Sequence, residues 1–127
     1  MWRTVMATDS YRPGSEDRAG AFSGPNGTFA VVADGMGGRS GGAEAVLQAV
    51  QELAERLPQK WDPVRWMATL DTQMAVSGKA GETTGVVAHL TPLGPVGVAV
   101  GDSVAWWITA DDWGSLTTAS TPKPWVG

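Results

Sequence analysis

The sequence predicts a fold of the α+β class, in which strands and helices occupy separate parts of the chain. Three observations lead to this prediction. Short β-prone segments come first, two amphipathic helical segments occupy the middle, and apolar residues with a two-residue period fill much of the last third. With 127 residues, the chain is expected to form a single domain. Because strands and helices do not alternate one by one, we do not expect a doubly wound parallel sheet.

Three candidate strands lie in the first third of the chain. Residues 3–8 form the first, and residues 19–22 and 28–33 form a pair around an Asn-Gly hairpin signal within residues 23–27. The third strand runs directly into the glycine-rich segment 34–42 (DGMGGRSGG). Glycine is unfavourable inside helices and strands, so this segment is predicted to be a loop.

Two helices are predicted in the middle of the chain. Apolar residues recur at three- and four-residue spacing over residues 43–57, with Ser40 as a candidate cap and Pro58 as a stop. A second helix is expected to start at Asp62 and Pro63, which occupy the preferred cap and first-turn positions. Its methionines are expected in the core.

The last third is predicted to form an antiparallel meander. Four candidate strands follow one another, at residues 83–90, 96–100, 104–109 and, more weakly, 116–119. A tight turn at residues 101–103 would place Val98 and Val100 on one face with Val104 and Trp106. Trp106 is therefore expected on the core side of the sheet.

Composition excludes several classes of function. The net charge of −4 makes nucleic acid an improbable partner, because nucleic-acid binding requires a basic face. The absence of cysteine excludes disulfides, thiolate zinc sites and a thiol nucleophile. With His89 as the single histidine, any metal must be held mainly by oxygen atoms. We find no targeting segment and no apolar stretch of membrane-spanning length, so no membrane partner is expected and the cytoplasm is the default location.

Asp34 and Gly35 form the strongest candidate site. A carboxylate at the end of a buried strand, followed by glycines that allow close backbone approach, suits a hard divalent cation. An isolated Asp-Gly pair is more typical of a simple turn. A dinucleotide-binding loop is a further alternative, but the third glycine of its pattern is displaced and the Asp34 carboxylate would face the pyrophosphate.

Other acidic residues lie in predicted turns. Glu16 and Asp17 precede a strand, with Arg12 close enough to pair with an oxyanion, and Asp102 lies at a hairpin turn. Taken singly, each is more typical of a solvated turn. Taken together with Asp34, they would repel one another unless cations lie between them. Two such ions can activate water and neutralise a phosphoryl group.

Four segments resemble motifs of one family, the metal-dependent serine/threonine protein phosphatases of type 2C. The clearest is DGMGG at residues 34–38. Residues 15–18 (SEDR) resemble the family's Asn-Glu-Asp motif, with Arg12 in the place of its phosphate-binding arginine. Residues 81–84 (GETT) and 100–103 (VGDS) resemble two later motifs in the same order.

The resemblance implies an α-β-β-α sandwich of antiparallel sheets flanked by helices, with two manganese or magnesium ions and a weaker third. By this analogy Asp34 would bridge the two ions and the Gly35 carbonyl would bind one of them. Glu16 would act through a coordinated water with support from Asp17, and Asp102 would help bind the third ion. Arg12 would hold the phosphate of a phosphoserine or phosphothreonine in a protein substrate, and a water activated by the metal would attack phosphorus.

The chain also departs from the family pattern. Ser15 replaces the usual asparagine, and Val104 replaces an arginine. The later metal-binding aspartates of the family have no counterpart after Asp112, which implies an N-terminal portion of the catalytic domain, inactive or weakly metal-binding by itself. A non-catalytic binding module related to the phosphatases is therefore the alternative. The sequence predicts neither the oligomeric state nor the substrate protein.

Overall fold

The computed structural model describes residues 2–9, 14–35, 41–56, 60–78, 81–117 and 126. Its elements follow the order β1 (Arg18–Gly24), β2 (Gly27–Ala33), α1 (Gly42–Arg56), α2 (Pro63–Ser77), β3 (Gly85–Thr91), β4 (Gly94–Val100), β5 (Trp106–Ile108) and β6 (Trp113–Ser115). Strands and helices are segregated and the strands pair antiparallel, which confirms the predicted α+β class.

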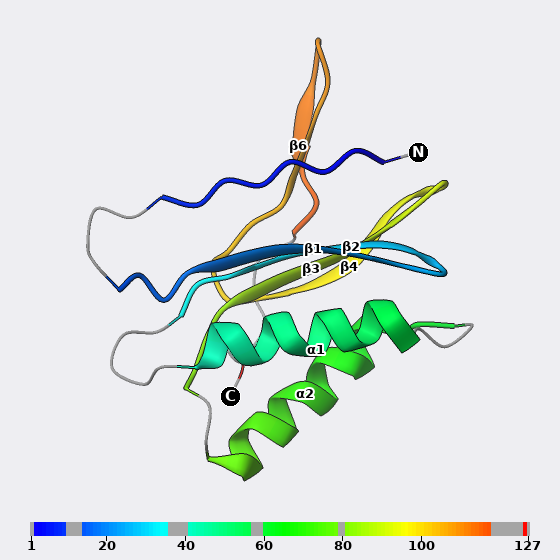
Figure 1. Ribbon diagram of the computed structural model, residues 1–127. Helices are drawn as coiled ribbons and strands as arrows, with labels where there is room; N and C mark the ends of the chain where they lie inside the picture. The colour runs from blue at the N-terminus through cyan, green and yellow to red at the C-terminus, as the bar shows by residue number, and fades with distance from the viewer. Residues whose placement is uncertain are drawn as a thin grey trace.

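β1 to β4 form one antiparallel sheet in which the strands lie in sequence order. The two helices are inserted between β2 and β3, which are nevertheless neighbours in the sheet. Both helices lie on one side of this sheet, whereas the β5–β6 hairpin projects from the opposite side (Figure 1). The structure therefore has one face covered by helices and one face that no described helix covers.

The core lies between the sheet and the helices. α1 packs on β1 and β2, and α2 packs on β4. Buried apolar side chains from both layers meet there: Phe29, Val31 and Val87 from the strands, Val46, Val50 and Leu53 from α1, and Met67, Leu70 and Met74 from α2. The apolar spacing in both helical segments predicted these buried faces.

Local signals account for the start of α2 and for the first hairpin. The Asp62 carboxylate accepts a hydrogen bond from the Arg65 amide at 3.1 Å, as expected of a cap residue, and Pro63 follows it. β1 and β2 are joined by a two-residue turn, with Gly24 paired to Gly27. The His89 ring stacks on Phe29 and its Nε2 lies 2.8 Å from the Asn26 carbonyl, which ties this turn to β3. The candidate capping and stop residues Ser40 and Pro58 lie outside the described residues.

Two of the predicted strands are wrong. Residues 2–9 form no strand, and the Trp2 indole instead donates a hydrogen bond to the Thr91 carbonyl at 2.7 Å. Of the strand expected at residues 116–119, residues 116–117 are described and lie outside any strand. The strand lies earlier, at Trp113–Ser115, because Thr109 and Asp112 close a turn that sets the register of β6 against β5. Alternation alone does not form a strand when no partner supplies the ladder hydrogen bonds.

The pairing expected across residues 101–103 is also wrong. β4 pairs with β3, and β5 pairs with β6, so Val98 and Trp106 belong to different sheets. Trp106 is 59% exposed instead of lying in the core. The chain leaves the sheet after Val100 because Ser103 turns back to bond with Thr84, at the start of β3.

Candidate functional site

The four motif segments meet at one end of the β1–β4 sheet. In an antiparallel meander, the starts of the first and third strands lie beside the ends of the second and fourth. Here Arg18 pairs with Ala33, and Gly85 pairs with Val100. The segments just outside these residues are those at 15–17, 34–35, 81–84 and 101–103, so the topology gathers the motifs.

The backbone of Asp34 is held by the two threonines before β3. The Asp34 carbonyl accepts hydrogen bonds from the Thr84 amide at 2.9 Å and from the Thr83 hydroxyl at 2.8 Å. Both threonines are buried, and Thr83 also forms bridges to Gly35 on one side and Val126 on the other. Buried hydroxyls bonded to main chain fix a loop more firmly than solvated ones, so the position of Asp34 is well determined.

The Asp34 side chain faces two other acids. A hydrogen bond with Asp17 raises the pKa of the Asp34 carboxyl above its ordinary value of 3.8, and desolvation and the negative charges of Asp17 and Asp102 act in the same direction. Two carboxyl groups can share a hydrogen bond only when one of them carries a proton. Without a cation, this cluster is therefore electrostatically unfavourable in its ionised form.

Glu16 packs directly against Gly35. A Cβ atom at Gly35 would lie 2.6 Å from the Glu16 Cβ and 2.9 Å from its carbonyl oxygen, so only glycine fits at position 35. The Oε2 atom of Glu16 is buried and has no hydrogen-bond partner among the described residues. A buried carboxylate oxygen without a partner is costly, and it is an available ligand for a cation.

Arg18 braces the segment that carries Glu16 and Asp17. Its Nη1 atom donates to the carbonyls of Ser15 and Asp17, each at 2.8 Å, and its Nη2 atom forms an ion pair with Glu44 of α1. No local pattern in the sequence predicts this role for Arg18 or for Glu44. The fold places the start of β1 beside the start of α1. Because these two segments are distant in the sequence, the ion pair of Glu44 with Arg18 could not be predicted from a local pattern.

Asp102 is connected to the other motifs through its neighbour. The hydroxyls of Ser103 and Thr84 are hydrogen-bonded, which joins the 101–103 turn to the threonines that hold Asp34. Gly101 has a φ of 91°, a left-handed conformation that favours glycine at the end of β4. In the VGDS segment, Ser103 therefore supports Thr84, which holds Asp34, and Asp102 contributes a negative charge near the Asp34 carboxyl.

The structure thus brings Glu16, Asp17, Asp34, Gly35 and Asp102 to one end of the sheet. Arg12 lies outside the described residues. Within the described ranges, no group of three or more His, Cys, Asp or Glu side chains is positioned to hold a metal ion. The donor types suit Mn²⁺ or Mg²⁺, since all are carboxylate or carbonyl oxygens.

Comparison of the chain with protein family models, with curated proteins and with solved structures finds no match. In the described part of the chain, neither helix has the length and apolar character needed to cross a membrane.

Proposed function

We propose that this chain carries the metal-binding end of a type 2C-like protein serine/threonine phosphatase. The observation that carries the proposal is the contact of Asp34 with Asp17, under the charge of Asp102. These three acids come from three separate motifs and repel one another when ionised, and a bound divalent cation would offset that repulsion. The unpartnered Glu16 oxygen beside Gly35 supports the same conclusion.

The proposed ligands are the carboxylates of Asp34, Asp17, Glu16 and Asp102 and the carbonyl of Gly35. When bound, two Mn²⁺ or Mg²⁺ ions would supply charge neutralisation for the phosphoryl group and acidify a water molecule. Thr83 and Thr84 would keep Asp34 oriented, and Arg18 would hold the Glu16–Asp17 segment in place. Arg12 is proposed to bind the phosphate of a phosphoserine or phosphothreonine substrate.

The proposal includes the α-β-β-α sandwich and an N-terminal position within the catalytic domain. An antiparallel sheet covered by two helices on one face supports one half of such a sandwich. The open opposite face is where a second sheet would pack.

Calorimetric titration of the chain with Mn²⁺ tests the proposal. Weak but saturable heat is expected for the wild-type chain and for Asp111→Asn, which removes an exposed acid from the β5–β6 turn. Asp34→Asn should abolish it. In the assembled catalytic domain, Mn²⁺-dependent hydrolysis of an aryl phosphate should be lost in Asp34→Asn and kept in Asp111→Asn. Equal turnover in these two variants would refute the role of Asp34.

A non-catalytic binding module is the second candidate. It is favoured by the finding that the described residues contain no ready-made set of three acidic or histidine ligands. This candidate predicts no saturable Mn²⁺ heat and no hydrolysis, while the fold stays intact by circular dichroism. Mn²⁺ binding that depends on Asp34 would exclude it.

A further inference from the structure

Val126 is buried beside Thr83, although the two residues are far apart in the sequence. The side chain of Val126 is fully buried and belongs to the core between the sheet and the helices. The Thr83 amide donates a hydrogen bond to the Val126 carbonyl at 3.0 Å, and the Val126 amide donates to the Thr83 carbonyl at 2.7 Å. Two residues that exchange both bonds form a hydrogen-bonded pair of an antiparallel ladder. Val126 is therefore held by its packing and by its main chain.

Thr83 lies in the centre of a bridge of three residues. It pairs with Val126 on one side and with Gly35 on the other. Its hydroxyl donates a hydrogen bond to the Asp34 carbonyl at 2.8 Å. Thr83 is fully buried, so its backbone N–H and C=O groups would have no water to bond with if Val126 moved away. The position of Thr83, and with it that of Asp34, therefore depends on Val126.

We propose that Val126 is a positioning residue of the candidate metal site and that it acts on Asp34 through Thr83. This role rests on the proposed function, in which the Asp34 carboxylate and the Gly35 carbonyl bind the cation. Metal ligands bind tightly when the residues behind them hold them in the required geometry, and loss of such a residue lowers the affinity for the metal. Val126 supplies no ligand, only one backbone donor and one backbone acceptor to Thr83.

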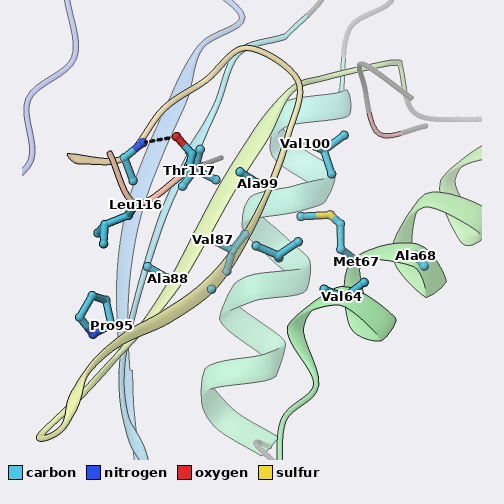
Figure 2. Close-up of a pocket in the computed structure, with 14 residues that line it drawn as sticks. Val64, Met67, Ala68, Val87, Ala88, Pro95, Ala99, Val100, Leu116 and Thr117 are labelled. Atoms are coloured by element: carbon cyan, nitrogen blue, oxygen red, sulfur yellow. Dashed lines mark hydrogen bonds between the residues drawn. The ribbon is translucent and has the colours of Figure 1, made fainter. Parts of the chain in front are cut away.

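The alternative role of Val126 is simply to fill the core. Val87 of β3 provides a matched control, because it is also a valine and is equally buried. Val87 lines a pocket of about 490 Å³ beside β4 (Figure 2), which Asp34 and Thr83 do not line. Truncation of Val87 should therefore lower stability through lost packing and leave the bridge at Thr83 intact.

Calorimetric titration of the whole chain with Mn²⁺ compares three variants. Val126→Pro keeps an apolar side chain but removes the N–H group that donates to Thr83, and it should weaken Mn²⁺ binding about tenfold or more. Val126→Ala and Val87→Ala lose packing but keep their backbone bonds, so both should bind Mn²⁺ like the wild-type chain. Equal affinities of Val126→Pro and Val87→Ala would overturn the proposal.

Hydrogen exchange of the unmodified chain without metal is a second test, which does not require any variant to fold. The Thr84 amide donates to the Asp34 carbonyl, so its protection reports whether Asp34 is held. The amides of Val126, Thr83 and Thr84 should open together as one unit. Protection of the Thr84 amide that persists when Val126 opens would overturn the proposal.

The two measurements also separate the role of Val126 from the proposed function. If the wild-type chain binds no Mn²⁺ while Val126 and Thr84 open together, the metal site is refuted and the positioning of Asp34 by Val126 is supported. If the wild-type chain binds Mn²⁺ and Val126→Pro binds it equally well, the metal site is supported and the role of Val126 is refuted.

Discussion

The motif end of the β1–β4 sheet and the β5–β6 hairpin are both built from turns, but they are held in different ways. At the motif end, Thr83 and Thr84 bond to Asp34, and Ser103 bonds to Thr84. In the hairpin, β5 and β6 pack on each other and on no other helix or strand among those described.

The two regions show that an apolar β-prone sequence does not by itself produce a buried strand. β2 and β5 are both rich in apolar residues, yet Phe29 and Val31 are buried and all three residues of β5 are exposed. The difference lies in the helices, which cover one face of the main sheet and do not reach the hairpin. Stability should therefore be concentrated in the main sheet, and four measurements can break or sharpen this comparison.

The largest effect is expected for Phe29→Ala. Phe29 is 1% exposed, stacks on His89 and contacts Trp61 edge to face at 5.2 Å. Its truncation should lower the free energy of unfolding by about 3–5 kcal/mol, as for other large-to-small core changes. Urea denaturation measures this loss. Val32→Ala, on the open face of the same strand, should cost less than about 1 kcal/mol, and equal losses would contradict the layer arrangement.

A smaller loss is expected for Thr83→Val. Valine keeps the shape but removes the hydroxyl that donates to the Asp34 carbonyl. The free energy of unfolding should fall by about 1 kcal/mol, because the acceptor keeps its bond from the Thr84 amide. Thr28→Val, which removes an exposed hydroxyl pair with Ser23, should cost under about 0.5 kcal/mol in the same assay. A neutral Thr83→Val would indicate that the motif end is not held in this way.

Asp34→Asn should change the pH dependence of stability in the absence of metal. The pKa of Asp34 is raised in the folded chain, so the folded state binds this proton more tightly than the unfolded state. Stability should then fall as the pH rises from about 3.8 through the higher folded value. Asparagine does not titrate. The melting temperature of Asp34→Asn minus that of the wild-type chain should therefore increase as the pH rises over that interval.

Asp111→Asn is the matched control for this pH experiment. It removes one negative charge from the exposed turn between β5 and β6. If the melting temperature relative to the wild-type chain rises with pH by a similar amount in both variants, net charge and not the contact with Asp17 causes the effect. Melting curves followed by circular dichroism provide the measurement.

The smallest effect is expected for Trp106→Ala. Trp106 is 59% exposed, and its ring lies 5.9 Å from that of Trp113 within the same hairpin. The free energy of unfolding should change by no more than about 0.5 kcal/mol. A loss comparable to that of Phe29→Ala would mean that the hairpin packs on the main sheet in solution.

Local patterns in the sequence determined the elements of the main sheet and both helices. The apolar spacing predicted the buried faces of α1 and α2, and Asp62 with Pro63 predicted where α2 begins. The β1–β2 hairpin also follows from its local Asn-Gly turn signal. These features depend on residues that are close together in the chain, which is why pattern alone predicts them.

Tertiary structure decided which strands pair and which distant side chains contact one another. Nothing near Ser103 in the sequence predicts its bond to Thr84, and this contact directs the chain out of the sheet, so that β5 pairs with β6 and not with β4. The brace from Arg18 to Glu44 and the close contact of Glu16 with Gly35 likewise join residues that are distant in sequence. Hydrogen bonds and steric fit between distant residues depend on angstrom-scale placement, which only the packed molecule provides.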